Sequence, residues 1–427
     1  MSAQDPPRPA LLPAAGVLFA AADGGSDALD GLARRLGPVH GRVRADHLRY
    51  KPGRSVIGRL NDSDGTPIGW VSGYGPAAAD KAARLLRTGA KAGVELPVFE
   101  LGDGHVLIAG PIGADKRLGR LMRRTGSVRA DRSVRGGVLN YNPGRRLVVR
   151  RRDLPASGAG PGGDVVVKLS RRPYGHVAPL AAALKAGGVP ALEPHPLAGH
   201  EEHALAYEYY GTGNLAAGGA GAEFEQAGGL LRAWHASGAR VEAATSLPRL
   251  DATARMGAVV AGVEGILPGA GGAARRAAER LGEALAEAGG DVVPLHGDYS
   301  PDQLLRGARG LRVIDADRAA WGHPGWDLGC FAAADLLAGE AGSAPGLDTA
   351  AALLRGYGGA RHLPAFAGAH VLLRALEPFR AADPDWVPRV SRRLALAERL
   401  AAAPPDGGVA AVRDALRAVT PLPEGTP

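Results

Sequence analysis

Two stretches of this chain are similar to each other, and the elements predicted after each stretch come in the same order. The first covers residues 49–57 (RYKPGRSVI) and the second residues 140–148 (NYNPGRRLV). Each precedes a Gly/Asp-rich turn, an apolar strand, an Ala/Leu-rich helix, a link with Gly and Pro, and another strand. The predicted segments are strands 68–71 and 106–109 with helix 77–86, and strands 165–167 and 204–207 with helix 177–184. This order predicts a duplicated β-rich unit with one helix.

From about residue 214 onward the pattern becomes helical. Residues 224–236 place apolar side chains at helical spacing. Further helices are predicted at 272–288, 326–338, 347–356, 365–380 and 387–402. The predicted fold class is therefore α+β, with two β-rich units before a mostly helical half.

The composition is that of a globular protein. With 427 residues, of which 45% are hydrophobic, the chain can bury a sizeable core in two or three domains. The one cysteine, Cys330, excludes an intramolecular disulfide and fits a reducing compartment, and we expect it in the core. We identify no signal peptide in the short apolar stretch 14–22, and no run approaches the ~18 apolar residues of a membrane span. We therefore expect a cytoplasmic protein without a membrane partner.

The formal net charge of +8 is concentrated in one region. Between Asp115 and Asp153 there are thirteen Lys/Arg and three acids. One interpretation is a solvated basic face. The other is that the basic 116–152 region attracts nucleotide phosphates or an acidic peptide or protein partner. Nucleic acid is not an expected partner, because aromatic side chains that would stack on bases are not interleaved with this patch.

Two apolar, strand-like segments each deliver an acidic residue. The segment 295–304 (LHGDYSPDQL) contains Asp298 and Gln303, and the segment 313–317 (VIDAD) contains Asp315. One carboxylate can accept the proton of an attacking hydroxyl, while the amide and the second carboxylate can hold Mg²⁺ against the phosphates of a nucleotide. This set predicts phosphoryl transfer.

The two β-rich units differ at a position that bears on this chemistry. Aligning their strands places Lys168 of the second unit against Ser72 of the first. A lysine in a valine-rich strand is commonly an edge or snorkelling residue. Upstream of a candidate metal site, it is also a candidate to bind phosphate.

These segments resemble the aminoglycoside phosphotransferase and choline kinase superfamily. The catalytic loop of that family reads His-Gly-Asp, four residues and Asn, and this chain has 296–298 (HGD) with Gln303 at the Asn position. The metal-binding strand of the family reads Ile-Asp, a hydrophobic residue and an acid, which matches 314–317 (IDAD). The segment 322–328 (GHPGWDL) resembles the Gly-Asp-Pro-x-x-Asp-Leu that follows, and 232–235 (RAWH) is similar to a helix ending in Leu-His.

The resemblance covers roughly residues 135–405 and implies a protein-kinase-like two-lobe fold. It implies a kinase N-lobe at 131–213 and a helical C-lobe with the catalytic and metal-binding loops at 214–427. An extra N-terminal accessory domain at 1–130, resembling a degenerate second N-lobe, would precede them. The segments 377–380 and 384–386 look like the C-terminal helices of actinobacterial members.

The resemblance also implies roles for individual residues. Asp298 would be the catalytic base, and Gln303 and Asp315 would bind Mg²⁺. Gln303 keeps the amide oxygen of the family's Asn on a side chain that is one methylene longer. Lys168 would contact the α- and β-phosphates of ATP.

A hinge and several further candidates follow from the same resemblance. The residues that would hold the adenine are Glu208, Tyr209 and Tyr210. Asp317 is either a second metal or substrate contact or a solvated residue, and the ring of His296 would fix the loop. Arg145 either packs over the nucleotide or serves the strand turn. Asp327, which precedes an apolar helix, is read as its N-cap.

One element of the family pattern is missing. The family's helix after the lysine strand supplies a Glu that orients the ammonium, yet residues 169–192 contain no acid. Either Lys168 is held differently, or an acid from elsewhere substitutes, with Glu193, Glu201 and Asp80 as candidates.

Three functions are consistent with this sequence. The first is an ATP-dependent phosphotransferase that moves the γ-phosphate to a hydroxyl of a sugar, aminosugar or antibiotic. The second is a kinase that phosphorylates Ser/Thr of a ribosomal natural-product precursor peptide, recruited by the basic region and the N-terminal unit. The third is a pseudokinase that serves as a binding or scaffold subunit, suggested by Gln303 and the missing Glu.

Overall fold

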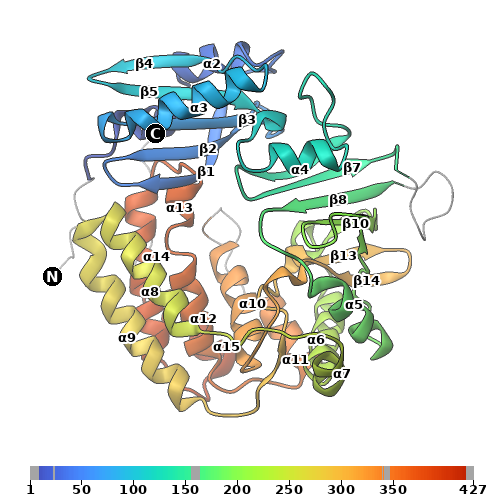
Figure 1. Ribbon diagram of the computed structural model, residues 1–427. Coiled ribbons are helices and arrows are strands. Elements are labelled where there is room, and N and C mark those ends of the chain that lie inside the picture. The colour runs from blue at the N-terminus through green and yellow to red at the C-terminus, as the bar shows by residue number, and fades with distance from the viewer. Residues whose placement is uncertain (1–8, 23–24, 155–163, 339, 341–346, 420–427) are drawn as a thin grey trace.

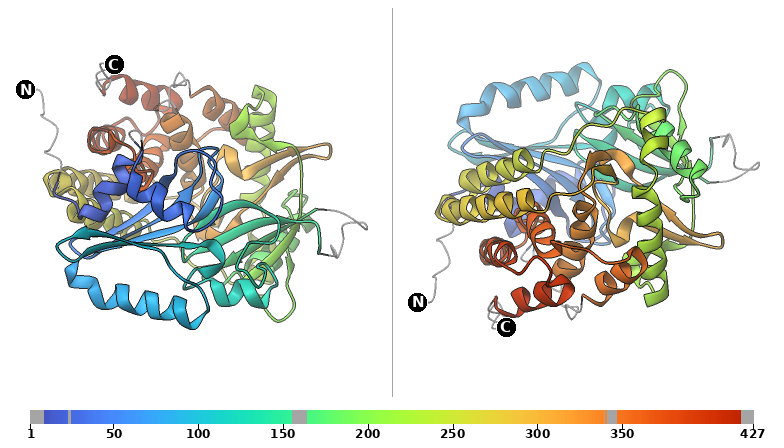
Figure 2. Two further views of the ribbon diagram at one scale, coloured as in Figure 1. Left: turned by 90° about the horizontal axis from the view of Figure 1, so that it is seen from above. Right: turned by 90° about the horizontal axis from the view of Figure 1, so that it is seen from below.

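The computed structural model describes residues 9–22, 25–154, 164–338, 340 and 347–419. Two five-stranded sheets lie side by side above a layer of helices (Figure 1). The view from below shows α8 and α9 next to the C-terminal helices (Figure 2). The α+β class predicted from the sequence is confirmed.

The N-terminal unit contains the first sheet. Its elements are α1 (Pro13–Ala20), α2 (Asp27–Arg34), β1 (Arg44–Lys51), β2 (Ser55–Asn61), β3 (Pro67–Tyr74), α3 (Ala79–Lys91), β4 (Val98–Gly102) and β5 (His105–Pro111). The sheet order is β1-β2-β3-β5-β4, and every pair is antiparallel. A short helix, α4 (Gly119–Arg124), leads to the second sheet.

The second sheet has the same strand order as the first. Its elements are β6 (Gly137–Asn142), β7 (Arg146–Arg151), β8 (Val165–Ser170), α5 (Val177–Ala186), β9 (His195–Pro196) and β10 (Ala204–Glu208), in the order β6-β7-β8-β10-β9. In the first sheet Ile57 pairs with Ser72, and in the second Val148 pairs with Lys168. The alignment of Ser72 with Lys168 therefore holds residue for residue, whereas the proposed division into three domains stays a prediction.

The remaining elements form the helical half. They are β11 (Gly213–Asn214), α6 (Gly221–His235), α7 (Gly238–Ala244), α8 (Ala252–Ile266), α9 (Gly271–Glu287), β12 (Val293–Leu295), β13 (Leu304–Gly307), β14 (Gly310–Val313), β15 (Ala320–Gly322), α10 (Gly325–Ala338), α11 (Asp348–Tyr357), α12 (Leu363–Leu373), α13 (Glu377–Arg380), α14 (Trp386–Ala401) and α15 (Gly408–Arg417). The short strands pair as β11-β13-β14 and β12-β15. None of the described helices is long and apolar enough to cross a membrane.

The single helix predicted over 365–380 is wrong, because the chain breaks between α12 and α13. Pro378 has no backbone N–H to donate to the carbonyl of Arg374, and its ring would crowd that carbonyl in a continuous helix. The carbonyl of Arg374 instead accepts a hydrogen bond from Nη1 of Arg393, at 2.6 Å.

The first sheet packs against the helical half as well as against the second sheet. Phe19 and Tyr50 of the N-terminal unit contact the ring of Phe379, with centroids 5.3 and 5.8 Å apart. Apolar residues of the other face, such as Trp70 and Ile108, share a core with Tyr141 and Leu147 of the second sheet. The N-terminal unit is thus fixed on two sides.

Asp115 ties the N-terminal unit to the turn between β6 and β7. Its buried carboxylate accepts hydrogen bonds from the hydroxyl of Tyr141 at 2.7 Å and from the N–H of Gly144 at 2.5 Å. It also accepts from the N–H groups of Arg117 and Leu118. One side chain therefore sets the position of this turn.

We expect Asp115→Ala to lower the free energy of unfolding by about 3 kcal/mol, because it leaves several buried donors without an acceptor. Urea unfolding followed by circular dichroism measures this loss. Asp131→Ala is the matched control, since Asp131 is an exposed acid of the same linker that accepts from Ser133. Equal losses in the two variants would contradict a special role for Asp115.

Candidate active site

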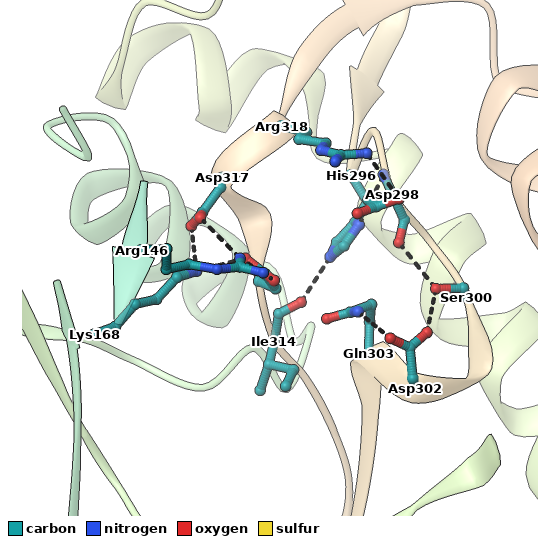
Figure 3. A network of polar contacts seen from close by, with 11 residues as sticks. Arg146, Lys168, His296, Asp298, Ser300, Asp302, Gln303, Ile314, Asp317 and Arg318 are labelled. Atoms are coloured by element: carbon teal, nitrogen blue, oxygen red, sulfur yellow. Dashed lines mark hydrogen bonds and ion pairs between the residues drawn. The ribbon is translucent and has the colours of Figure 1, made fainter. Parts of the chain in front are cut away.

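The catalytic-loop candidate is the segment that starts with residues 296–298 (HGD), directly after β12. The chain turns sharply there. Gly297 has φ +81°, and a Cβ there would lie 2.1 Å from the carbonyl oxygen of Arg318. Only glycine fits this approach of two backbones. The turn brings the residue that follows, Asp298, next to Arg318 (Figure 3).

The backbone of the catalytic-loop candidate is anchored by the side chain of Asp327. Its carboxylate, which has no solvent exposure, accepts hydrogen bonds from the N–H groups of His296 and Gly297, both at 2.8 Å. Nε2 of His235, on α6, donates to the same carboxylate at 3.1 Å. The N-cap assignment of Asp327 is wrong, because α10 begins at Gly325 and the side chain points to the loop. The sequence contained a signal for this role, namely the family-like GHPGWDL segment.

The ring of His296 is fully buried and fixed at both nitrogens. Nε2 lies 2.8 Å from the carbonyl oxygen of Ile314, so it carries the proton and donates. Nδ1 then accepts the N–H of Asp298, at 3.3 Å. The ring packs edge-on against Trp234 and Tyr299. The ring thus links the loop to residues 314–317 (IDAD), which are called the metal-strand segment from here on.

Asp298 points toward the open side of the site. Its side chain is 27% exposed, and Oδ1 lies 3.2 Å from Nη1 of the exposed Arg318. No described residue of the catalytic-loop candidate donates a hydrogen bond to this carboxylate, so the carboxylate is available to a substrate hydroxyl.

Lys168 binds two carboxylates of the metal-strand segment. Its buried ammonium lies 2.5 Å from Oδ1 of Asp315 and 2.6 Å from Oδ1 of Asp317 (Figure 3). The three acids considered as substitutes for the missing Glu are not its partners. The carboxylate of Glu193 binds Lys185, and that of Glu201 accepts the N–H of Gly199.

Arg146 adds a second cation to this network, and the sequence reasoning missed it. Its Nη1 lies 3.0 Å from Oδ2 of Asp315 and 3.7 Å from Oδ2 of Asp317. It stands in the strand that follows the Pro-Gly turn, so its side chain lies on the same face as Lys168. The signal in the sequence was the doubled arginine after that turn.

The two carboxylates differ in their affinity for protons. Burial works to raise the pKa of Asp315, but Lys168 and Arg146 outweigh it, so that the pKa lies well below its usual range. Burial and the neighbouring Asp315 raise the pKa of Asp317 to about 6. Asp315 also has φ +65°, an uncommon backbone conformation for a residue other than glycine.

Gln303 lies near these acids, in a short turn after the catalytic-loop candidate. Its Nε2 donates to Oδ2 of Asp302 at 2.6 Å, and Ser300 donates to the other oxygen of Asp302 at 2.5 Å. Because the amide nitrogen faces Asp302, the amide oxygen is left for another partner. Asp302 thus orients Gln303.

The hinge candidates connect the second sheet with the helical half. The carboxylate of Glu208 binds Arg309 at 2.5 Å, and the hydroxyl of Tyr210 donates to the carbonyl of Gly310 at 2.6 Å. The ring of Tyr209 is exposed and lies under the guanidinium of Arg150, 3.8 Å away. Arg150 thus covers one face of the Tyr209 ring.

Two further expectations concern residues near the site. Cys330 is fully buried in α10, as expected for a core position. Arg145 is exposed in the β6–β7 turn, while Tyr141 beside it is buried and binds Asp115, so Tyr141 serves the turn.

The oxygen atoms of this site fit a hard divalent cation. Asp315 and Asp317 share one ammonium, and Gln303 has an amide oxygen nearby. Carboxylate and amide oxygens are the ligands that Mg²⁺ takes. Within the part of the chain that the structure describes, no cluster of three or more His, Cys, Asp or Glu residues has the arrangement of a metal site. A cation here would therefore need the amide and the phosphates of a nucleotide as further ligands.

A sheet with a buried lysine, set above helices whose loops carry acids, is the architecture of protein-kinase-like phosphotransferases. The family model described as "Phosphotransferase enzyme family" matches residues 142–369, more than half of the chain. The chain belongs to this family, and the two-lobe fold and enzymatic class expected from the sequence are confirmed.

Solved structures show distant similarity to this chain. A choline/ethanolamine kinase family protein from Mesorhizobium loti is 18% identical, covers 70% of this chain and 99% of its own, and has a TM-score of 0.46. Choline kinase LicA from Streptococcus pneumoniae is 15% identical, covers 67% of this chain and 98% of its own, and has a TM-score of 0.46. Macrolide 2'-phosphotransferase MphH from Brachybacterium faecium is 20% identical, covers 80% of this chain and 99% of its own, and has a TM-score of 0.37. No curated protein matches the chain.

Proposed function

We propose that this enzyme transfers the γ-phosphate of ATP to a hydroxyl group of a small molecule. The observation that carries the proposal is the buried ion network of Lys168 with Asp315 and Asp317, set beside a loop that presents Asp298. In the transfer, the acceptor oxygen forms a bond to the γ-phosphorus, and the bond from that phosphorus to the bridging oxygen of ADP breaks.

Each residue has one task in this proposal. Asp298 accepts the proton of the acceptor hydroxyl, and Lys168 holds the α- and β-phosphates. Arg146, which binds Asp315, is proposed to contact the same phosphates. His296 and Asp327 keep the loop in position and do not exchange protons with the substrate.

Mg²⁺ is the proposed cation, with Asp315 and Gln303 as its ligands and Asp317 as a further candidate. When bound, it neutralises negative charge on the phosphates. The raised pKa of Asp317 fits a carboxylate that shares its site with a second negative group.

Adenine is proposed to lie against the hinge at residues 208–210. The backbone there is held by the hydrogen bond from the N–H of Tyr209 to the carbonyl of Asp164, at 2.9 Å. Glu208 and Tyr210 are each tied to the β13–β14 hairpin, so they position the hinge from outside.

The two alternative functions, a scaffold subunit without activity and a peptide kinase, differ in their support. Membership of a phosphotransferase family, together with the intact Lys168 and Asp298, disfavours a scaffold subunit without activity. A peptide acceptor stays a prediction. The basic region that would recruit it is partly neutralised, because Arg150 and Arg152 bind Asp164 and Arg151 binds Asp153.

We expect Lys168→Met to weaken binding of Mg·AMP-PNP roughly tenfold or more, because a charge-assisted contact to the phosphates is lost. Isothermal titration calorimetry measures the affinity. Lys185→Met is the control, since Lys185 is an exposed lysine on α5 whose ammonium binds Glu193 and not the acids of the site. Unchanged affinity in Lys168→Met, or an equal loss in both variants, would remove the basis of the proposed nucleotide site.

A further inference from the structure

The ring of Tyr174 lies over the ammonium of Lys168. Tyr174 stands in the segment between β8 and α5, and Nζ of Lys168 lies 5.0 Å from the centroid of its ring. An ammonium within about 6 Å of a ring centroid is attracted to the electron-rich face of the ring. Residues 169–192, where the family pattern has its Glu, contain no acid but do contain this ring. Besides the carboxylates of Asp315 and Asp317, the ring is thus a further partner of the ammonium.

The packing and the backbone around Tyr174 fix its ring. The side chain is buried and shares an apolar cluster with Val177 and Leu205. The N–H of Tyr174 donates to the carbonyl of Glu202 at 2.5 Å, and its carbonyl accepts from the N–H of Val177 at 2.8 Å. Val177 is the first residue of α5, and Leu205 of β10 pairs with Lys168 of β8. The ring is therefore held both from the helix and from the strand next to Lys168.

The ring of Tyr174 is neutral at physiological pH. Burial is the main reason that the pKa of its hydroxyl lies well above the usual range, and the charge of Asp317 raises this pKa further. A neutral phenol attracts the ammonium through the face of its ring, so it adds no negative charge to the site. A Glu in its place would be a third carboxylate beside Asp315 and Asp317, and it would repel the phosphates of a nucleotide.

The ring also differs from the two acids in what else it binds. Asp315 is a proposed ligand of Mg²⁺ and Asp317 is a further candidate, because carboxylate oxygens suit a hard cation. These oxygens would then be shared between the metal and Lys168, and their hold on the ammonium would weaken. An aromatic face is not a ligand for Mg²⁺, so the contact of the Tyr174 ring with the ammonium does not compete with the metal.

We propose that Tyr174 is a positioning residue, whose ring holds the ammonium of Lys168 in place for the phosphates of the nucleotide. It takes the place of the acid that the family pattern has after the lysine strand. The inference rests on the proposed function, because Lys168 is the residue assigned to the α- and β-phosphates. A ring that only fills the core would behave differently in the variants that follow.

Tyr174→Phe and Tyr174→Leu separate the ring from the space that it fills. We expect Tyr174→Leu to weaken binding of Mg·AMP-PNP roughly three- to tenfold, because one cation–π contact is lost. Tyr174→Phe keeps the ring face and should stay within about twofold of the parent enzyme. Isothermal titration calorimetry measures these affinities. Val177→Ala is the control, since it removes packing from the same cluster but leaves the ring, and it should lower the unfolding midpoint without a comparable loss of affinity.

A double-mutant cycle with Lys168→Met shows whether Tyr174 acts through the ammonium. In the Lys168→Met background, Tyr174→Leu should change the affinity for Mg·AMP-PNP by less than about twofold, because the partner of the ring is already gone. The proposal is overturned if Tyr174→Leu weakens binding equally in both backgrounds. It is also overturned if Tyr174→Phe weakens binding as much as Tyr174→Leu does.

Nuclear magnetic resonance with lysine-selective labelling tests the contact without nucleotide. The chain has six lysines, so the ε-methylene signal of Lys168 can be assigned by its loss in Lys168→Met. A ring over the ammonium gives this signal a ring-current shift, which Tyr174→Phe should keep and Tyr174→Leu should abolish. An unshifted signal in the parent enzyme overturns the contact itself. Failure of the proposed function is distinct, because Lys168→Met would then bind Mg·AMP-PNP as the parent enzyme does, while the ring-current shift would remain.

Discussion

Replacing Asp298 with Asn is expected to lower the rate of phosphate transfer by roughly 10²–10⁴-fold, the usual contribution of a general base. The amide cannot take the proton of the attacking hydroxyl, although it fills the same space. Nucleotide affinity should stay near that of the parent enzyme, because the phosphates are assigned to Lys168. The rate is measured with a coupled assay for ADP, and the affinity by calorimetry.

The control for this experiment is Asp291→Asn, an exposed acid just before β12. It makes the same chemical change outside the site and should leave the rate unaltered. If Asp298→Asn kept the parent rate, Asp298 could not be the proton acceptor. If its nucleotide affinity fell as far as its rate, the residue would act in binding.

The second large effect is expected for Asp327→Asn, which should lower the free energy of unfolding by about 3–5 kcal/mol. The carboxylate accepts from two backbone N–H groups and from His235 in a site without solvent. An amide presents its own N–H₂ group to one of these donors, so at least one buried donor loses its acceptor. The catalytic-loop candidate should then lose its fixed position, and activity should fall with stability.

Urea unfolding and the ADP assay measure the two consequences of Asp327→Asn. Asp335→Asn on the same helix is the matched control, because Asp335 accepts only the N–H of Ala350, at 3.0 Å. The control should cost less and leave the rate unchanged. Equal stability of the two variants would show that Asp327 does not anchor the loop.

The repeat and the catalytic segments could be read from the sequence because their signals are local. The Tyr-x-Pro-Gly-Arg stretches and the elements after them predicted two similar β-rich units, and the pairing of Ile57 with Ser72 and of Val148 with Lys168 has the same register. Strand periodicity and turn residues act over a few positions, so they survive in a single sequence.

The partners of the Lys168 ammonium could not be predicted from local sequence patterns. The family pattern places this acid on the helix after the lysine strand, whereas the actual partners, Asp315 and Asp317, come from a segment more than 140 residues further along the chain. The N-cap prediction for Asp327 is wrong for a similar reason. Its place at the start of an apolar stretch suits a cap in the sequence, and only the fold brings its carboxylate to the N–H groups of His296 and Gly297.

The sequence by itself determined the class of chemistry and the duplicated β-rich architecture, because both depend on residue types at short, fixed spacing. The tertiary structure decided which charges meet. It joined Lys168 and Arg146 to Asp315 and Asp317, packed the N-terminal unit against both other parts, and brought Arg318 to Asp298. Coulomb interactions depend on distance in space and not on separation along the chain, so they become visible only after folding.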